Sequence, residues 1–275
     1  MKSVKLHNGI ELPFLAYGTY QIDNADSVKQ ALEAGYRYFD TAAFYGNERE
    51  VGAAIRESGL PREEVMVATK LWKTDMGYDN ALRQFDRSCD ALGLGYVDVY
   101  LIHWPNPDES EESWKQLDIE TWRAFEELYR AGRVRAIGVS NFLPHHIENL
   151  IQNCEIVPML DQLELHPGYL QPYAVEYCRE KGIAVQGWRP LAKGVIGEEP
   201  LLCALAEKYG TTSAKIALTA LAQLGIIPLP RSSSSARMRD NMDLWSFALS
   251  EEDLMKIQSM PPFGWSGEHP DRPRV

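Results

Sequence analysis

The chain has 275 residues and a mass of 31.1 kDa, a length that suits one large barrel or two ordinary domains. Apolar residues make up 45% of it and recur along its whole length, which excludes a disordered chain. Its net charge of -11, with no dense stripe of Lys and Arg, disfavours nucleic acid as a partner, because the overall field repels a polyanion.

The sequence contains no segment typical of membrane insertion or secretion. The first residues, MKSVKLHNGIELPFLAYG, include a polar or charged residue every few positions, and no later run is long enough to cross a bilayer. The four cysteines, at positions 89, 154, 178 and 203, lie far apart and form no CxxC pair, so we expect reduced thiols in the core. We therefore expect a soluble cytoplasmic protein.

The chain begins with a pattern typical of a β-hairpin. Residues 4–15, VKLHNGIELPFL, alternate polar and apolar side chains around Asn8-Gly9, the preferred dipeptide of a type I′ turn. After it one unit repeats: a short apolar strand, a polar loop and an amphipathic helix. The strands are expected at residues 14–17, 36–39, 65–69, 97–102, 134–139, 157–160, 183–186 and 226–229.

Helical spacing is clearest in two segments between these strands. Apolar residues recur at steps of three and four over residues 81–92, before Gly93, and over residues 122–129, before Gly132. Alternation of strands and helices favours parallel pairing, because each helix returns the chain to the starting edge. With about eight strands and no linker, we predict an α/β fold, one (β/α)8 TIM barrel over residues 1–275 with an N-terminal β-hairpin. A doubly wound open sheet is the alternative.

In such a barrel the chemistry lies at the carboxyl ends of the strands. Polar residues collect there: Asp40 and Tyr45 follow the second strand, Lys70 the third and His103 the fourth. The later strands end, in order, at Ser140-Asn141, at Gln162 and Glu164, at Trp188 and at Arg231-Ser232.

Asp40, Tyr45, Lys70 and His103 form a proton-donating set if they meet. A phenol is a poor acid at neutral pH, but an ammonium beside it stabilises the phenolate, so Lys70 is expected to lower the pKa of Tyr45. Asp40 supplies the carboxylate that a buried Lys70 needs, and His103 donates a hydrogen bond to a substrate oxygen. Taken singly, Asp40 suits a helix cap, Lys70 a solvated side chain and His103 a core histidine. Their occurrence at successive strand ends favours function.

Several motifs together resemble the aldo-keto reductases, in particular bacterial members related to 2,5-diketo-gluconate reductases. They are FDTAAFYGNE (39–48), ATKLW (68–72), LIHWP (101–105), GVSNF (138–142), the QxExHP of residues 162–167 and RSSSSARMRDN (231–241). The resemblance extends from the hairpin to about residue 260. It implies a barrel without a Rossmann domain, NADPH bound in extended form, and a catalytic tetrad of Asp40, Tyr45, Lys70 and His103 with Tyr45 as the general acid.

The same resemblance implies the cofactor contacts. The nicotinamide carboxamide would be held by Ser140, Asn141 and Gln162, and Trp188 would stack on the nicotinamide. The pyrophosphate would lie along Leu191, Lys193 and Gly194, with Arg189 beside them. The adenosine and its 2′-phosphate would be held by Arg231, Ser232, Ser233, Ser234, Arg237 and Asn241.

Three departures from the family pattern concern the cofactor segments. Arg189 stands where relatives usually have a small residue, and Asp161 stands where Asn usually precedes the glutamine. Pro228-Leu229-Pro230 replace a more regular strand end, since proline cannot donate to a ladder. We expect these departures to affect the geometry of the cofactor loops and not the type of reaction.

Other nucleotide- and metal-binding motifs are weak or missing. No GxGxxG or GxxxxGK[ST] occurs. His145-His146 follow Pro144 at an expected helix start, but adjacent histidines of a helix point to different faces and no HExxH accompanies them, so no metal site is expected. RSSSSAR suits either a flexible low-complexity patch or an anion-binding turn, and its place between a strand and a helix favours the turn.

The sequence thus predicts a monomeric enzyme that reduces small aldehydes or ketones with NADPH. A nucleotide-binding barrel with a sensor or structural role is one alternative, and a barrel isomerase acting on a phosphosugar is another. The substrate is expected to contact Tyr20, Trp104, Phe263 and Trp265. Specificity is expected to come from residues 106–117 and from a C-terminal tail at about residues 261–275, near the substrate pocket.

Overall fold

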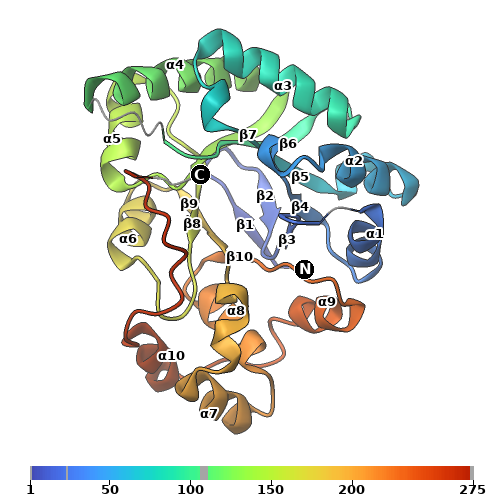
Figure 1. The fold of residues 1–275 in the computed structure, drawn as a ribbon, viewed down its shortest axis with the longest axis vertical. Coiled ribbons are helices and arrows are strands. Elements are labelled where there is room, and N and C mark those ends of the chain that lie inside the picture. Colours follow the sequence, from blue (N-terminus) through green and yellow to red (C-terminus); the bar gives the residue numbers. More distant parts are fainter. Residues whose placement is uncertain (1, 23, 106–110, 273–275) are drawn as a thin grey trace.

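The structure, a computed structural model, describes residues 2–22, 24–105 and 111–272, and a ring of parallel strands forms its centre (Figure 1). Within these residues, one parallel sheet contains β3 Tyr17–Gly18, β4 Tyr38–Asp40, β5 Met66–Leu71, β6 Val97–Ile102, β7 Val134–Ser140, β8 Leu160–Glu164, β9 Ala184–Trp188 and β10 Ile227–Leu229. The strand order follows the chain without reversal, β10-β9-β8-β7-β6-β5-β4-β3. The predicted (β/α)8 barrel is confirmed, since a doubly wound sheet would reverse its strand order.

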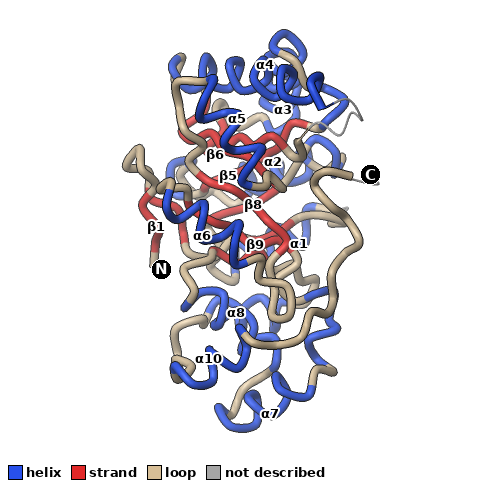
Figure 2. Tube along the Cα trace, turned by 90° about the vertical axis from the view of Figure 1, so that its left-hand side faces the viewer, coloured by secondary structure: helices blue, strands red, loops and turns tan. Residues whose placement is uncertain are grey.

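Helices surround the strands (Figures 1 and 2). Those between successive strands are α1 Ala25–Glu33, α2 Glu48–Glu57, α3 Tyr78–Leu92, α4 Glu111–Arg130, α5 Pro144–Asn153, α6 Pro172–Glu180, α7 Pro200–Tyr209 and α8 Ser213–Gln223. After β10 come α9 Ser235–Met242 and α10 Glu251–Gln258, and short 3-10 helices are η1 Ala43–Tyr45, η2 Arg62–Glu64, η3 Lys73–Asp75 and η4 Ala192–Gly197. Gly93 ends α3 with a φ of 61°, as predicted. No helix in the described part of the chain is long and apolar enough to cross a membrane.

The barrel closes between its last and first strands through proline carbonyls. Ala16 N–H donates to Pro228 O and Gly18 N–H donates to Pro230 O, each at 3.2 Å. Proline lacks only the donor of a peptide unit, so its carbonyl still serves this contact. β10 also keeps its register with β9, with Pro228 opposite Gly187. The unusual Pro228-Leu229-Pro230 sequence therefore does not interrupt the barrel.

The sixth strand of the barrel lies further along the chain than the apolar pattern predicts. The pattern indicates residues 157–160, but β8 runs from Leu160 to Glu164. Its polar residues Asp161, Gln162 and Glu164 are all buried, and buried polar side chains hide a strand from a hydrophobicity pattern. Gln162 and Glu164 therefore belong to the strand instead of following it, as Lys70 belongs to β5.

The N-terminal hairpin is confirmed, but its turn is not of type I′. The hairpin strands, β1 Ser3–Lys5 and β2 Glu11–Pro13, pair antiparallel. A type I′ turn needs a positive φ at both Asn8 and Gly9, and only Gly9 has one, at 90°. The side chain of Asn8 points to the barrel, where its Nδ2 donates to Arg135 O at 3.0 Å. This bond fastens the hairpin beside the start of β7, and Figure 2 shows the hairpin and the C-terminal tail at opposite ends of the barrel.

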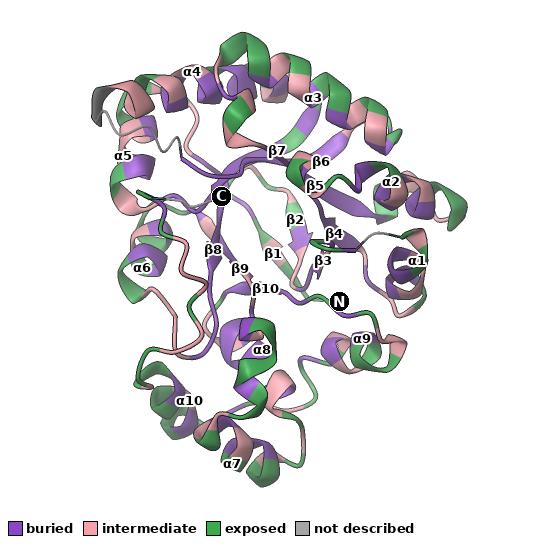
Figure 3. Cartoon of the chain, in the orientation of Figure 1, coloured by how far each residue is buried: buried purple, intermediate pink, exposed green. Residues whose placement is uncertain are grey.

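The core lies inside the strand ring and between the strands and helices (Figure 3). All residues of β5 and β6 are buried. Between the sheet and α4, the ring of Tyr100 stacks on that of Phe125 at 4.4 Å, and Trp122 continues the stack. These apolar layers hold the strands rigidly, so the side chains at the strand ends have fixed positions.

Helices α2 and α3 approach so closely at Gly52 that the position requires glycine. A Cβ there would lie 1.9 Å from Leu92 O, a backbone atom that cannot move aside. We predict that Gly52→Ala lowers the free energy of unfolding by about 2 kcal/mol or more, because overpacking exceeds the roughly 1 kcal/mol that alanine adds to helix stability. Urea denaturation measures this.

Gly197→Ala is the matched control, because no heavy atom lies within 4 Å of its Cβ position. We expect it to change stability by less than about 0.5 kcal/mol. Equal stabilities of Gly52→Ala and Gly197→Ala would contradict the close approach.

Candidate active site

The four residues expected to act on protons lie together at one end of the barrel. Asp40 is the last residue of β4, Tyr45 lies in η1 behind it, Lys70 is in the last part of β5, and His103 directly follows β6. These three strands are neighbours in the sheet, so residues far apart in the sequence meet at its carboxyl edge.

The ammonium group of Lys70 lies at the centre of this group. Its Nζ is 2.6 Å from Asp40 Oδ1, 3.0 Å from Thr41 O and 3.2 Å from Tyr45 Oη. An ammonium carries three protons, so these three acceptors satisfy it. Lys70 is 0% exposed and Asp40 is 3% exposed. The ion pair is therefore withdrawn from water, where its attraction is screened much less than at the surface.

The pKa of Tyr45 is raised and not lowered as expected. Burial raises the pKa of Tyr45 well above its ordinary value, and the charge of Asp40 raises it further. Burial also lowers the pKa of Lys70, an effect that Asp40 opposes. Tyr45 is thus a neutral phenol that accepts a hydrogen bond from Lys70 and keeps its own proton to donate. The lysine charge lies where it would stabilise a phenolate once the proton has left.

His103 faces the same group as a neutral imidazole. Its ring centroid lies 5.5 Å from that of Tyr45. Burial lowers the pKa of His103 well below its ordinary value, and the charge of Lys70 acts in the same direction. Its Nδ1 is buried without a hydrogen-bond partner among the described residues. A neutral imidazole retains one N–H, so His103 is able to donate to an uncharged oxygen.

Two aromatic residues that the sequence analysis left unassigned form a wall beside His103. Phe44 and Trp72 stack with ring centroids 3.9 Å apart, and Trp72 lies 5.1 Å from the His103 ring. Phe44 is 44% exposed. Their positions in the sequence could have indicated this role, because Phe44 is adjacent to Tyr45 in FDTAAFYGNE and Trp72 lies two residues after Lys70 in ATKLW. They offer an apolar surface next to the proton donors.

Gln162 connects this group to the opposite side of the barrel. Its Nε2 donates to Asp40 Oδ2 at 2.8 Å and to Gln186 Oε1 at 3.1 Å. Gln186 in turn donates to Tyr38 Oη at 2.7 Å. Both carboxylate oxygens of Asp40 are therefore held, one by Lys70 and the other by Gln162.

Ser140, Asn141 and Trp188 form a second group at the ends of β7 and β9, as expected for a shared binding surface. Trp188 Nε1 donates to Asn141 Oδ1 at 2.8 Å, and Asn141 Nδ2 donates to Ser140 Oγ at 3.1 Å. Asn141 Nδ2 also donates to His103 O at 2.9 Å, which joins this group to the first. Asn141 has a φ of 63°, a conformation that Asn tolerates better than most residues.

The segment after Trp188 has an unusual backbone. The φ angles of Arg189, Ala192, Lys193 and Gly194 are 54°, 44°, 55° and 96°. Leu191, between them, is partly buried against the core. Lys193 and Gly194 are exposed, and no heavy atom lies within 4 Å of a Cβ position on Gly194. A ligand therefore has room to approach this backbone.

The serine-rich segment forms a loop-to-helix junction, as predicted. Ser234 caps α9 by accepting a hydrogen bond from Arg237 N–H at 3.5 Å. Arg231 Nη1 donates to Tyr20 O and Gln21 Oε1, each at 3.0 Å. Of the remaining expected residues, Ser233 is exposed, Ser232 is buried, and Asn241 is buried with a hydrogen bond to Tyr36. Because β9 and β10 are neighbours, this junction and residues 189–194 leave adjacent strands.

A sequence model of the Aldo/keto reductase family matches residues 15–261 of the chain. The chain belongs to the aldo-keto reductase family. A glyoxal reductase from Bacillus subtilis is 41% identical over 273 residues, covering 98% of this chain and 96% of that protein. A 9,11-endoperoxide prostaglandin H2 reductase from Trypanosoma cruzi is 42% identical over 275 residues, covering 98% of this chain and 94% of that protein.

Solved structures of aldo-keto reductases agree with this assignment. An aldo-keto reductase enzyme from a Medee basin deep-sea metagenome library has a TM-score of 0.93 and 38% identity, covering 99% of this chain and 100% of that one. An aldo-keto reductase from Bombyx mori, solved in complex with NADP, has a TM-score of 0.88 and 32% identity, covering 99% of each chain.

The residues expected to touch substrate are spread over this aldo-keto reductase barrel. Tyr20 is 46% exposed, with its ring centroid 5.0 Å from that of Tyr45. Trp104 is 5% exposed, beside His103 in the chain. Phe263 lies 6.0 Å from the His166 ring, and Trp265 is 47% exposed. Only Tyr20 of these has a ring contact with Tyr45 within the described ranges. The expected specificity loop, residues 106–117, lies in part outside the described residues, and from Glu111 it belongs to α4.

Asp161, a departure from the aldo-keto reductase pattern, points away from the strand-end group. Its Oδ2 accepts a hydrogen bond from Cys178 Sγ of α6 at 3.8 Å. Burial raises the pKa of Asp161 well above its ordinary value. Side chains alternate along a strand, so Asp161 faces α6 while Gln162 faces Asp40. The expectation that Asp161 affects the cofactor loops is not supported by this position.

His145 and His146 converge, contrary to the expectation that they point to different faces. Their Nε2 atoms lie 2.9 Å and 3.0 Å from the same oxygen of Asp271 in the tail. The three side chains have the residue types and spacing of a metal site. However, His146 Nδ1 accepts a hydrogen bond from Leu143 N–H at 3.0 Å, so the neutral ring carries its proton on Nε2 and donates it to Asp271. This tautomer makes the cluster an anchor for the tail.

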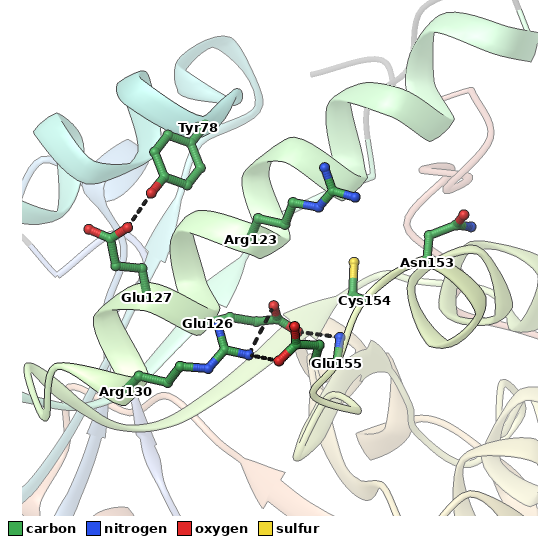
Figure 4. Close-up of a pocket in the computed structure, with 8 residues that line it drawn as sticks. All are labelled: Tyr78, Arg123, Glu126, Glu127, Arg130, Asn153, Cys154 and Glu155. Carbon is green, nitrogen blue, oxygen red and sulfur yellow. Dashed lines mark hydrogen bonds and ion pairs between the residues drawn. The ribbon is translucent and has the colours of Figure 1, made fainter.

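A polar pocket of about 320 Å³ lies on the outside of the barrel, between α4 and the connection after α5 (Figure 4). Its polar groups largely satisfy one another. Glu126 accepts from the backbone N–H groups of Glu155 and Ile156 at 2.7 Å, and Arg130 lies 2.6 Å from the Glu155 carboxylate. We interpret this pocket as a structural contact that fixes α4 to the chain before β8.

The buried ion pair allows a direct test by stability. We predict that Asp40→Asn lowers the free energy of unfolding by about 3 kcal/mol at neutral pH, because Lys70 then keeps a buried charge without a carboxylate. Deprotonation of Lys70 removes this buried charge and so relieves the loss of stability. Since the folded-state pKa of Lys70 is lowered, the unfolded state binds more protons, so stability should rise with pH until about 10.4, the ordinary lysine value.

Asp86→Asn is the control for urea denaturation of Asp40→Asn. Asp86 pairs with Arg133 at 2.7 Å, but the side chains are 58% and 46% exposed. An exposed pair contributes less than about 1 kcal/mol. Equal losses in the two variants, or a penalty in Asp40→Asn that does not change with pH, would refute a buried charge at Lys70.

Proposed function

We propose that this protein reduces aldehydes or ketones to alcohols with NADPH, and that Tyr45 is the general acid. The observation on which the proposal depends is the contact of 3.2 Å between Lys70 Nζ and Tyr45 Oη, with Asp40 2.6 Å behind the lysine. This arrangement places a neutral proton donor beside a fixed positive charge that is itself buried. A carbonyl oxygen becomes negative as it is reduced, and such a donor and charge stabilise that change.

Each member of the tetrad has a separate task in this proposal. Tyr45 gives its proton to the substrate oxygen, and Lys70 stabilises the phenolate that remains. Asp40 keeps Lys70 charged against the effect of burial. His103, neutral at physiological pH, donates a hydrogen bond that orients the carbonyl. Phe44 and Trp72 provide the apolar wall against which the rest of the substrate packs.

The donor set at the ends of β9 and β10 is suited to NADPH. Lys193, Arg231 and Arg237 are exposed cations, although the chain as a whole has a charge of -11. The capped start of α9 adds backbone N–H groups and a positive helix end. Trp188 offers an aromatic face and Asn141 an amide for the nicotinamide end.

When bound, NADPH supplies the hydride. Ser140, Asn141 and Gln162 would hold its carboxamide and Trp188 its ring. Leu191, Lys193 and Gly194 would line the pyrophosphate, and residues 231–241 would hold the 2′-phosphate end. Arg189 would contribute only its backbone there, because its side chain contacts Glu164 and Gly264. The Bombyx mori relative solved with NADP supports this choice of cofactor.

Two relatives at almost the same identity are named for different substrates, glyoxal and a prostaglandin endoperoxide. We therefore assign the reaction to the tetrad and the choice among small carbonyl compounds to the surrounding loops. We further propose that the protein is a cytoplasmic monomer.

Replacement of Tyr45 by Phe tests the mechanism. The variant keeps the ring and loses the proton donor, so we predict that kcat for carbonyl reduction falls by roughly 10² to 10⁴-fold. NADPH affinity should change little, because the phenol takes no part in nucleotide binding. NADPH consumption with a panel of small aldehydes and ketones measures kcat, and quenching of Trp fluorescence measures affinity.

The control for Tyr45→Phe is Tyr173→Phe, which removes a hydroxyl that is exposed on α6. It should retain the full rate. Retention of the full rate by Tyr45→Phe as well would exclude Tyr45 as the acid, and absence of turnover in the parent protein on every carbonyl would contradict the proposed reaction.

Cofactor choice provides a separate test at Arg231 and Arg237. The 2′-phosphate distinguishes NADPH from NADH, and hydrogen bonds to charged groups contribute about 1.5 to 3 kcal/mol each. Each arginine should therefore give roughly ten- to a hundredfold preference, with non-additive effects for two. We predict a lower Kd for NADPH than for NADH, and this preference should weaken as the salt concentration rises. The double variant Arg231→Ala, Arg237→Ala should lose the preference.

Arg239→Ala is the matched control, because Arg239 is also exposed on α9 but lies beyond its first turn. It should leave both Kd values nearly unchanged. Equal affinities of the parent protein for NADPH and NADH would defeat the assignment of the 2′-phosphate to this junction.

A further inference from the structure

The C-terminal tail runs from α10 past α6 toward α5 (Figure 1). It fits tightly between two loops at the mouth of the barrel. Phe263 N–H donates to Gly168 O at 3.2 Å, and a Cβ on Gly168 would lie 2.1 Å from the Phe263 ring. A Cβ on Gly264 would lie 2.9 Å from Ala192 Cβ and 3.0 Å from His166 Cε1. The tail thus touches the backbone segment to which we assign the cofactor.

Glu164, at the end of β8, is the acceptor that fastens the tail. Its carboxylate is 3% exposed, and it accepts from Ser266 N–H at 2.9 Å and from Ser266 Oγ at 2.6 Å. These bonds are made to a charged group, which makes them stronger than ordinary hydrogen bonds. A carboxylate withdrawn from water also needs a positive charge nearby.

Arg189 supplies that charge. Its Nη1 lies 3.5 Å from Glu164 Oε1, and its Nη2 donates to Gly264 O at 3.4 Å. The side chain is 20% exposed, and its backbone directly follows Trp188, which lies opposite Glu164 in the β8–β9 register. One guanidinium group therefore contacts both the tail and the carboxylate that holds the tail, while its backbone belongs to residues 188–194.

We propose that Arg189 and Glu164 are a positioning pair that joins residues 188–194 to the tail at Gly264–Ser266. The inference rests on the proposed function, because it takes residues 188–194 as part of the cofactor site. A nucleotide held on this segment restricts Arg189, and Arg189 then fixes the tail beside the substrate side of the mouth. A small residue at position 189 could not span this distance.

The amide of Ser266 reports on the pair directly, because its N–H donates to Glu164. Hydrogen exchange of this amide is measured in the parent protein and in Arg189→Ser, each with and without NADPH. Without NADPH, exchange should be about tenfold faster in Arg189→Ser, since loss of one charged contact changes an equilibrium by roughly that factor. NADPH should slow the exchange in the parent protein and have no such effect in the variant.

Kinetics should separate this role from catalysis. In Arg189→Ser the KM for a small aldehyde should rise about tenfold, whereas kcat should change by less than about threefold, because binding of the aldehyde and not the chemical step is altered. Ser266→Ala should raise KM in the same way. Arg189→Lys keeps the positive charge but loses the second guanidinium nitrogen that donates to Gly264 O. Its KM should therefore lie between those of the parent protein and Arg189→Ser.

Arg179→Ser serves as the control, because Arg179 is an exposed arginine of α6 that pairs with Glu176. It should change neither exchange nor kinetics. Unchanged Ser266 exchange in Arg189→Ser would overturn the pair, and equal protection by NADPH in parent and variant would overturn the coupling. If NADPH does not quench the Trp fluorescence of the parent protein, the proposed function fails instead, and the comparison without NADPH still decides whether the pair holds the tail.

Discussion

The buried positive charge of Lys70 is the constraint on which this site depends. A lysine that is 0% exposed is tolerated only with its protons fully accepted, and Asp40, Thr41 and Tyr45 provide the acceptors. Asp40 in turn uses its second oxygen for Gln162 on β8. One charge thereby ties β4, η1, β5 and β8 together, so the strand register that satisfies Lys70 is also the register that places Tyr45 at the mouth.

Burial acts on Tyr45, Lys70 and His103 in a single direction, toward neutral side chains. It raises the pKa of Tyr45, and it lowers the pKa values of His103 and Lys70. Asp40 opposes burial only at Lys70, where its charge raises the pKa that burial lowers. The site therefore contains one compensated ion pair and two neutral donors, an arrangement in which little charge has to be reorganised before a proton moves.

The sequence predicted the features that depend on local pattern. β5 and β6 consist mainly of apolar residues, so Lys70 in β5 and His103 after β6 stood out. β8 was misplaced because its buried Asp161, Gln162 and Glu164 look like loop residues. The convergence of the two histidines depends on Asp271, more than a hundred positions away, and the contact of Arg189 with Glu164 depends on the register of two strands. Such contacts arise from the packed barrel, and no local pattern contains them.

The two ends of the proposed cofactor site depend on different kinds of electrostatic interaction. At the tetrad the charges of Asp40 and Lys70 are buried, so added salt hardly screens them. At the other end Lys193, Arg231 and Arg237 are exposed, and they act against the field of a chain with a net charge of -11. Ionic strength therefore acts on nucleotide affinity at one end and leaves proton donation at the other nearly unchanged. The Arg189–Glu164 pair lies between these ends, largely buried, and so belongs with the tetrad in this respect.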